Sequence, residues 1–352
     1  MGAGLPRDAF EHFQTNDIAQ INKESIIDKI VYMETRMSTP LVIDQQLARQ
    51  LLTQVDVPQI LRSLFRDLAA GQAVQPPQQL VEFPAGQGDF INYGGVLAQE
   101  RVYGVKTSPY IVREQGPLVT AWTLLMSMDS GQPLLLCDAG ELTTARTAAT
   151  TAVAVDALAA ASARRLTVIG SGPIARTHLH YVRGLREWQD IRLFSPSLAG
   201  QSAEQRQALL DLDPRLTLSD SLDQALEDAD VIMLCTSSAS PVIDPATLSK
   251  PALITSISTN AVRAHEVPPA SLGAMDVYCD YRVTTPGSAG EMRIAAEQHG
   301  WQPEAIVGDL AQLLSNQAPA PTYQRHAFFR SIGLGLEDIA LANALYRLQR
   351  AD

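Results

Sequence analysis

Apolar residues recur three and four positions apart from Pro40 to Ala73, which is the spacing of amphipathic helices. Two helices are expected here, in "DQQLARQLL" and in "VPQILRSLFRDLAAG", the second ending at Gly71. "FINYGGVL" and "RVYGVKTSPYIV" then predict strands, and "VTAWTLLMSMDSGQPLLLCDAG" predicts a hairpin that turns at Asp129-Ser130-Gly131. The Ala-rich run "ELTTARTAATTAVAVDALAA" predicts a long helix.

After Arg165, short apolar strands alternate with helical segments. The strands are "LTVIG", "IRLFS", "VIMLC", "ALITSIS" and, near Asp276, "VYCDY". Strands that are mostly apolar are typical of a parallel sheet with both faces covered. The terminal run "GLEDIALANALYRLQR" has an apolar face at helical spacing, so we expect it to return and pack on the N-terminal half.

These patterns predict an α/β protein with two domains. A Rossmann-type, doubly wound parallel sheet is expected over residues 151–324, and an α+β domain over 37–150 that is completed by the C-terminal helix in 325–352. Residues 1–36 carry charges throughout and precede what reads as a fresh start at Met37. We expect an appended or poorly ordered leader there, with a short docking helix as the alternative.

Composition narrows the classes of function. The 352 residues are 46% hydrophobic and 18% charged, and the net charge of -11 argues against a broad nucleic-acid-binding surface. No apolar run approaches the ~20 residues that a membrane-spanning helix needs. Cys137, Cys235 and Cys279 lie far apart without metal-ligand spacing. We therefore expect a cytoplasmic protein with reduced thiols, no metal and no membrane partner.

The stretch "VIGSGPIA" carries the pattern G-x-G-x-x-G/A directly after an expected strand and before an expected helix. Gly170 permits the tight turn, Gly172 lets the backbone approach a pyrophosphate, and Ala175 allows close packing of helix on strand. An ordinary strand-to-helix turn can have the same local sequence. However, the glycine pattern stands at the head of an alternating strand–helix series, which favours a nicotinamide dinucleotide as cofactor.

The second strand of such a fold ends in Asp or Glu when the cofactor is NAD, because the carboxylate binds the ribose 2′-hydroxyl. Ser195 stands at this position, about twenty residues past the glycines. Ser195 and Ser197 can hydrogen-bond a 2′-phosphate, although no obvious arginine follows. The sequence therefore favours NADP over NAD.

Two cations stand among apolar or small residues. Lys106 lies near the end of an expected strand, and Arg146 near the beginning of the Ala-rich helix. Such residues can bind a carboxylate, and arginine can do so with two parallel hydrogen bonds. A surface lysine and a helix-start charge would explain the two residues equally well.

The segments "GVK", "ELTTARTAA", "VIGSGPIA", "LCTSSASPVID", "HEV" and "SIGLGLEDIALA" occur in the order and spacing of the ornithine cyclodeaminase/mu-crystallin family. The chain resembles this family from Pro40 to its C-terminus. The family includes cyclodeaminases, archaeal-type alanine dehydrogenases, ketimine and pyrroline-carboxylate reductases, arginine dehydrogenase-like enzymes and the crystallin. The resemblance implies a Rossmann domain that binds NAD(P), and a homodimer built by the N-terminal region, which also binds the substrate.

The resemblance also implies roles for individual residues. The substrate carboxylate would lie between Lys106 and Arg146. Ser258 to Asn260 would lie by the nicotinamide, and Ile332 and Gly333 by the reacting carbon. Cofactor contacts would come from Gly170, Gly172, Pro173, Ile174, Ser195 and Thr236.

The chain departs from the family pattern in two places. Many relatives have an additional carboxylate-binding arginine after a proline pair, where this chain has Gln78 and Gln79. Cyclodeaminases carry a proton-exchanging aspartate in the loop after "ALITSIS", but here "STNAVRAHE" has no acidic residue before Glu266. Cyclisation with loss of ammonia is therefore not expected.

Other polar residues are weaker candidates. His265 and Glu266 adjoin the expected carboxyl-terminal edge of the sheet, where His265 would be a candidate acid or base, although a loop histidine is more often structural. Asp338 either orients catalytic groups or caps the last helix. His178 and His180 are two residues apart on one helix and so do not share a face for metal binding.

The expected function is that of an NAD(P)H-dependent oxidoreductase acting on the C–N bond of an amino or imino acid. An amino-acid dehydrogenase that uses a 2-oxo acid and ammonia is favoured, and the acidity of the chain points faintly to a cationic side chain such as that of arginine. The alternatives are a cyclic ketimine reductase acting on pyrroline- or piperideine-2-carboxylate, an ornithine cyclodeaminase, and a crystallin-like protein that binds NADPH and a small ligand without turnover.

Overall fold

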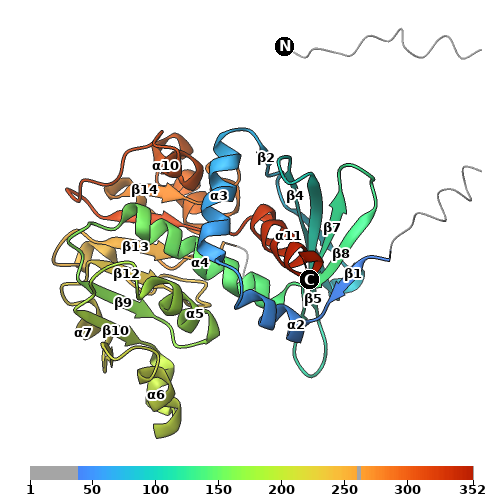
Figure 1. The fold of residues 1–352 in the computed structure, drawn as a ribbon. Coiled ribbons are helices and arrows are strands. Elements are labelled where there is room, and N and C mark those ends of the chain that lie inside the picture. Colours follow the sequence, from blue (N-terminus) through green and yellow to red (C-terminus); the bar gives the residue numbers. More distant parts are fainter. Residues whose placement is uncertain (1–38, 260–262, 352) are drawn as a thin grey trace, which may run out of the picture. The chain divides into compact units, whose positions relative to one another are not determined.

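The structure, a computed structural model, describes residues 39–259 and 263–351 (Figure 1). From Leu41 onward the chain forms one compact unit. The leader expected over residues 1–36 and the candidate site residue Asn260 lie outside the described residues.

The first of two sheets is built from the N-terminal part of the unit. Its strands run in the order β1 (Leu41–Ile43), β8 (Pro133–Asp138), β7 (Trp122–Ser127), β5 (Val102–Ile111), β4 (Gly88–Leu97) and β2 (Ala73–Val74), while β3 (Gln79–Glu82) pairs with β4 and β6 (Leu118–Val119) with β5. Among the described strands of this sheet, only β1 and β8 pair in parallel. The expected hairpin is confirmed as β7–β8, and Gly131 adopts φ +67 in its turn.

One face of this sheet is covered and the other is open. Helix α11 (Gly335–Ala351) packs against β4, β5, β7 and β8, as the C-terminal helix was expected to do, and α2 (Gln45–Leu52) and α3 (Val57–Ala69) pack near it (Figure 1). The alternation of side chains separates the faces. The cross-strand row Ile43, Cys137, Thr123 and Lys106 is buried, whereas the neighbouring row begins with Val42 and Leu136, which are 57% and 37% exposed.

The second sheet is parallel throughout, which confirms the expected Rossmann-type fold. Its order is β11 (Leu216–Leu218), β10 (Asp190–Phe194), β9 (Arg165–Ile169), β12 (Val231–Leu234), β13 (Leu253–Ser256), β16 (Ala327–Arg330), β14 (Asp276–Cys279) and β15 (Ile306–Asp309). The sequence patterns did not reveal β11, β15 and β16. Because β16 lies in this sheet, the chain returns to the first sheet after Arg330, later than the boundary expected at 325.

Helices cover both faces of the parallel sheet. Val231 and Met233 of β12 belong to one apolar cluster with residues of α4 (Gly140–Leu158) and α5 (Pro173–Val182). Ile232 and Leu234 belong to a second cluster with residues of α7 (Leu222–Leu226) and α9 (Gly290–Gln298). The other helices in the described residues are α6 (Ala203–Leu210), α8 (Thr285–Ser288) and α10 (Leu310–Leu314), with short 3-10 turns at Pro84–Gly86, Pro196–Gly200, Pro245–Thr247, Pro269–Ala274 and Pro303–Ala305. In the described part of the chain, no helix is both long enough and apolar enough to span a bilayer.

Candidate functional site

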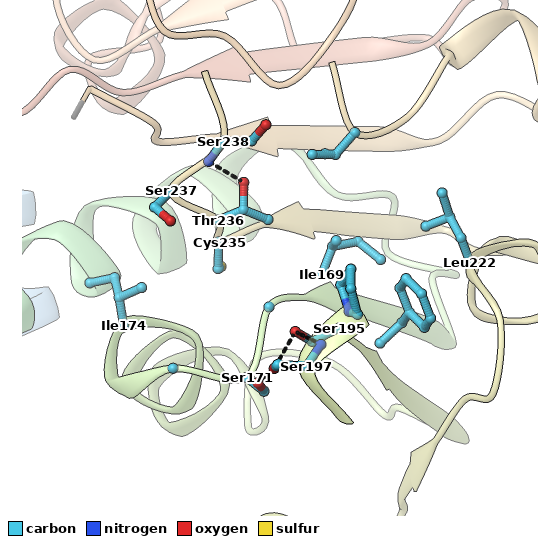
Figure 2. A pocket seen from close by; sticks show the side chains of 15 residues that line it. Ile169, Ser171, Ile174, Ser195, Ser197, Leu222, Cys235, Thr236, Ser237 and Ser238 are labelled. Atoms are coloured by element: carbon cyan, nitrogen blue, oxygen red, sulfur yellow. Dashed lines mark hydrogen bonds between the residues drawn. The ribbon is translucent and has the colours of Figure 1, made fainter. Parts of the chain in front are cut away.

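The carboxyl ends of β9, β10 and β12 open onto a cavity of about 760 Å³, which we name the cofactor cavity (Figure 2). It lies where the strand order reverses between β9 and β12, the usual ligand position in a doubly wound sheet. Its lining comprises Ile169, Gly170, Ser171, Gly172, Ile174, Phe194, Ser195, Pro196, Ser197, Leu222, Cys235, Thr236, Ser237, Ser238 and Val242.

The glycine turn has the geometry that a pyrophosphate needs. Gly170 adopts φ +127, and a Cβ there would lie 2.5 Å from the carbonyl oxygen of Cys235. Gly172 is the N-cap of α5 and has no atom within 4 Å of a Cβ position, so its backbone is open to a ligand. Pro173 occupies the first helical position, and Ala175, in the first turn of the helix, is buried. A phosphate can therefore approach the free N–H groups at the start of α5.

Three serine hydroxyls gather on one wall of the cofactor cavity. Ser197 Oγ lies 2.8 Å from Ser195 Oγ and 3.0 Å from Ser171 Oγ (Figure 2). Beside them, Arg176 Nε donates to the Ser171 carbonyl oxygen at 3.3 Å. Among the described residues that line this cavity none is acidic. The wall therefore offers hydroxyls and a neighbouring cation, and no carboxylate to repel an anion.

The opposite wall is held in place by a buried carboxylate. Thr236, Ser237 and Ser238 face the serine cluster across the cavity (Figure 2). Glu266 Oε1 accepts hydrogen bonds from Thr236 N and Oγ1, and Oε2 accepts from Ser256 Oγ and from the backbone N–H of residues 257 and 258. Glu266 thus ties the loop after β12 to the loop after β13, which is a positioning role.

Two smaller cavities continue from the cofactor cavity. The middle cavity, of about 250 Å³, shares Ile174, Thr236 and Ser237 with it and adds Thr143, Arg146, Thr147, Ile257, Ser258, Thr259, Ser331, Ile332 and Gly333. The outer cavity, of about 260 Å³, shares Ile332 and Gly333 with the middle one and adds Gln75, Pro77, Gln78, Tyr93, Val283, Thr284, Gly287, Ser288 and Leu334. Shared lining residues therefore connect all three.

A buried charge cluster borders the middle cavity. It consists of Lys106 from β5, Arg146 from α4, and Glu337 and Asp338 from α11, with exposed fractions of 2%, 7%, 0% and 0%. Lys106 Nζ lies 2.9 Å from Asp338 Oδ2 and 4.5 Å from the centre of the Tyr93 ring. Arg146 lies 3.3 Å from Glu337 Oε2 through Nη1 and 3.5 Å from Asp338 Oδ1 through Nε.

Burial and charge act against each other in this cluster. Burial lowers the pKa of Lys106, although the neighbouring Asp338 opposes the shift. Burial alone would lower the pKa of Arg146, but Asp338 and Glu337 together outweigh it, so the pKa is raised and the guanidinium stays charged. Burial raises the pKa of Glu337 to about 7.

Residues 40–351 match the ornithine cyclodeaminase/mu-crystallin family. The chain belongs to this family. It is 73% identical over 314 residues to the NAD(P)H-dependent anabolic L-arginine dehydrogenase DauB of Pseudomonas aeruginosa, an alignment that covers 89% of this chain and 99% of that protein.

Solved structures of the ornithine cyclodeaminase/mu-crystallin fold match at lower identity. The Δ1-pyrroline-2-carboxylate reductase of Thermococcus litoralis, in complex with NADH and L-proline, has a TM-score of 0.80 at 21% identity over 88% of this chain and 98% of its own. An archaeal alanine dehydrogenase dimer with bound NAD has a TM-score of 0.79 at 20% identity over 89% and 97%. Family and fold class are confirmed, as is the enzyme class: an NAD(P)-dependent oxidoreductase acting on amino or imino acids.

In this family member the loop between β16 and α11 is shaped around Arg146. Gly333 adopts φ +78, and a Cβ on it would lie only 2.0 Å from Arg146 Nη1. The buried Asp280 Oδ2 fixes the loop by accepting hydrogen bonds from Ser331 Oγ and from the backbone N–H of Ile332 and Gly333, at 3.0, 2.7 and 3.0 Å. Asp280 is therefore a second positioning carboxylate.

The structure gathers most of the sequence candidates and separates a few. Lys106 lines none of the three cavities, but its Nζ donates a hydrogen bond at 3.4 Å to Oγ1 of Thr143, which lines the middle cavity, and lies 4.5 Å from the ring centre of Tyr93, which lines the outer cavity. Gln78 lines the outer cavity, whereas Gln79 begins β3 and lines none of the three.

His178 and His265 each contact neighbouring residues of the fold. His178 Nδ1 lies 2.7 Å from the carbonyl oxygen of Ile174 and Nε2 lies 3.0 Å from Thr151 Oγ1, while His265 Nδ1 lies 2.7 Å from the carbonyl oxygen of Arg263. Within residues 39–259 and 263–351, no group of three His, Cys, Asp or Glu side chains is arranged to hold a metal ion.

Sequence reasoning missed three residues that shape the site: Glu337, Asp280 and Tyr93. Glu337 stands beside Asp338 in "GLEDIA", and Asp280 is the first acidic residue after the apolar "VYC" strand. A carboxylate at the carboxyl end of a buried parallel strand was the available signal for Asp280. Nothing local marks Tyr93, whose position depends on its pairing with Lys106 across β4 and β5.

Proposed function

We propose that this chain reduces the imine of 2-oxoarginine and ammonia to L-arginine with NAD(P)H. The observation that carries the proposal is the 73% identity to an L-arginine dehydrogenase over 99% of that protein's length. A shared fold alone would leave the substrate open, because members of one fold act on many substrates.

We propose that Lys106 and Arg146 bind the substrate carboxylate, with Asp338 holding both cations in place. Arg146 lines the middle cavity and presents a planar group that can bind a carboxylate with two hydrogen bonds. Fixing the carboxylate positions the neighbouring alpha carbon, and orientation of this kind supplies a large part of an enzymatic rate. A dinucleotide held by Gly170, Gly172, Ser195 and Thr236 would supply the hydride.

The outer cavity is proposed to take the side chain of the substrate. Its lining is neutral. The amide of Gln78 and the hydroxyls of Thr284 and Ser288 supply oxygen acceptors, and Tyr93 supplies an aromatic ring. Thr284 Oγ1 is buried and has no hydrogen-bond partner among the described residues. A guanidinium group has five N–H donors and stacks on aromatic rings, so it suits this lining.

We further propose that NADPH is preferred over NADH. Ser171, Ser195 and Ser197 together with Arg176 would hold the 2′-phosphate on the carboxylate-free wall of the cofactor cavity. Sequence reasoning found the serines but missed Arg176, because this arginine lies on α5 and not after the second strand.

The test is a turnover assay on the purified protein. We expect ammonium-dependent oxidation of NADPH that is fastest with 2-oxoarginine, and at least about tenfold slower with 2-oxohexanoate, which lacks the guanidinium group. Faster turnover of pyrroline-2-carboxylate without ammonium would replace the proposal with a cyclic imine reductase. Binding of NADPH and 2-oxoarginine without oxidation would make the chain a binding protein.

We propose that the open face of the first sheet forms a homodimer. Val42, Leu136, Leu124 and Val105 lie side by side in the register of β1, β8, β7 and β5, so an apolar row crosses the uncovered face. Exposed apolar area of this kind marks interaction surfaces. Sedimentation should give a dimer that Leu136→Lys converts to a monomer, whereas Val283→Lys, at a 69% exposed position outside this sheet, should leave it dimeric.

A further inference from the structure

The charges of the four side chains of the charge cluster sum to zero when all four are ionised. Lys106 and Arg146 carry two positive charges, and Glu337 and Asp338 carry two negative charges when ionised. All four side chains are buried, so water screens them little. A further charge brought among them without compensation is strongly unfavourable.

A 2-oxo acid brings such a charge. Its carboxylate is negative and its neighbouring carbonyl carbon is neutral. The nearby buried Asp280 adds a further negative charge. Its hydrogen-bond partners are backbone N–H groups and hydroxyls, none of which carries a compensating positive charge. Binding of the carboxylate to Lys106 and Arg146 therefore calls for one positive charge, and a proton from solvent is the available source.

Glu337 is the group placed to receive this proton. Its Oε1 accepts from Thr150 Oγ1 at 2.9 Å and its Oε2 faces Arg146. Burial is the largest cause that raises its pKa to about 7, Asp280 and Asp338 raise it further, and Arg146 and the Thr150 hydroxyl oppose the shift. The charged groups that face Glu337 are Arg146 from α4, Lys106 from β5, Asp280 after β14 and Asp338 on its own helix.

We propose that Glu337 takes up one proton from solvent when the substrate carboxylate binds. The Glu337 carboxylate becomes a neutral carboxylic acid, and the charge of Arg146 is then available to the substrate carboxylate. Glu337 acts through Arg146 and is a positioning residue. The inference rests on the proposed role of Lys106 and Arg146 in binding the carboxylate.

The linkage between proton and substrate sets the pH dependence of binding. Below about pH 7 Glu337 is already protonated, so the dissociation constant of a 2-oxo acid should not change with pH. Above this value each binding event consumes a proton, so the dissociation constant should rise by about tenfold per pH unit. The carboxylate of a 2-oxo acid stays ionised throughout this range.

Calorimetric titration measures the proton directly. 2-Oxoarginine and 2-oxopentanoate are titrated, without ammonium, into the protein with NADPH, whose nicotinamide is uncharged, at about pH 8, in phosphate and in Tris, whose ionisation enthalpies differ. We expect uptake of close to one proton per site in the wild-type protein and in the control Glu141→Gln, which changes a carboxylate at the start of α4 that pairs with Arg49. We expect none in Glu337→Gln, which keeps the shape of the protonated acid.

Each outcome decides the proposal. Binding without proton uptake in the wild-type protein, or uptake that persists in Glu337→Gln, overturns it. If Glu337→Gln does not fold, the wild-type protein alone decides, because its uptake must vanish at about pH 6. Proton-linked binding of 2-oxopentanoate without any turnover of 2-oxoarginine would refute the proposed function and leave this inference standing, whereas no binding of either acid refutes both.

Discussion

Replacement of Gly333 by alanine should displace Arg146, and so lower activity, with only a small loss of fold stability. The new Cβ would lie 2.0 Å from Arg146 Nη1 and 2.8 Å from Cζ. The guanidinium is the flexible end of its side chain, so it will move and give up its contacts with Glu337 and Asp338 at 3.3 and 3.5 Å. A displacement of about 1 Å in an orienting group costs about 100-fold in rate. The left-handed φ of +78 adds about 1–2 kcal/mol of backbone strain.

We therefore expect kcat/KM for 2-oxoarginine and ammonium to fall about 100-fold in Gly333→Ala, while the free energy of unfolding falls by only about 1–2 kcal/mol. The matched control is Gly300→Ala, because Gly300 has φ +69 but nothing within 4 Å of its Cβ position. It should lose similar stability in urea unfolding and keep its activity. If Gly333→Ala retains kcat/KM within about threefold of this control, the reasoning about Arg146 is refuted.

Four further substitutions test other parts of the site and the fold. Lys106→Met should lower kcat/KM at least about 100-fold and, by leaving the buried Asp338 without its 2.9 Å partner, lower the free energy of unfolding by about 3 kcal/mol. His265→Gln should leave kcat/KM within about twofold of the wild-type value and leave stability nearly unchanged. Equal turnover of Lys106→Met and His265→Gln would contradict the proposed role of Lys106 in binding the carboxylate. Ser195→Asp should repel a 2′-phosphate and lower kcat/KM for NADPH at least about tenfold relative to NADH, which cofactor titrations measure; an unchanged ratio argues against the phosphate wall. Burial lowers the pKa of His178 to about 4, so the unfolded chain binds more protons between about pH 6.5 and 4, and stability should fall by about 3 kcal/mol as the pH drops through this window. His178→Gln should remove that part of the pH dependence in urea unfolding, and an unaltered dependence would show that His178 titrates normally.

The parts of the fold that could be predicted are those with strong local patterns. The β7–β8 hairpin, α4, α11 and the strands β9, β10, β12 and β13 each contain enough apolar residues at one spacing to be recognised. Strand β16 has four residues, "AFFR", and lies between β13 and β14, which both precede it in the chain. Its place follows from packing and has no local signal, so the sequence placed it with the wrong sheet.

The site residues likewise fall into those that a local sequence pattern reveals and those that only the folded chain brings together. The glycine turn is one continuous segment, so Gly170, Gly172 and Ala175 could be recognised from their spacing. The charge cluster joins residues about 190 positions apart, as the hydrogen bond between Arg146 and Glu337 shows. Lys106 and Arg146 stood out as cations in apolar surroundings. Their partners could not be assigned, because a sequence does not show which helix will cover which strand.

The covering helix α11 has a consequence for the order in which the protein matures. During synthesis α11 emerges after every other described element, yet it supplies the lid of the first sheet and both anions that pair with Lys106 and Arg146. Until it docks, the two cations lack their paired anions and the apolar sheet face lacks its largest covering helix. The contacts that α11 must make span most of the chain, which slows folding. The nascent protein should therefore be a client of chaperones that shield such surfaces, and enzymatic competence should arise only in the last step of folding.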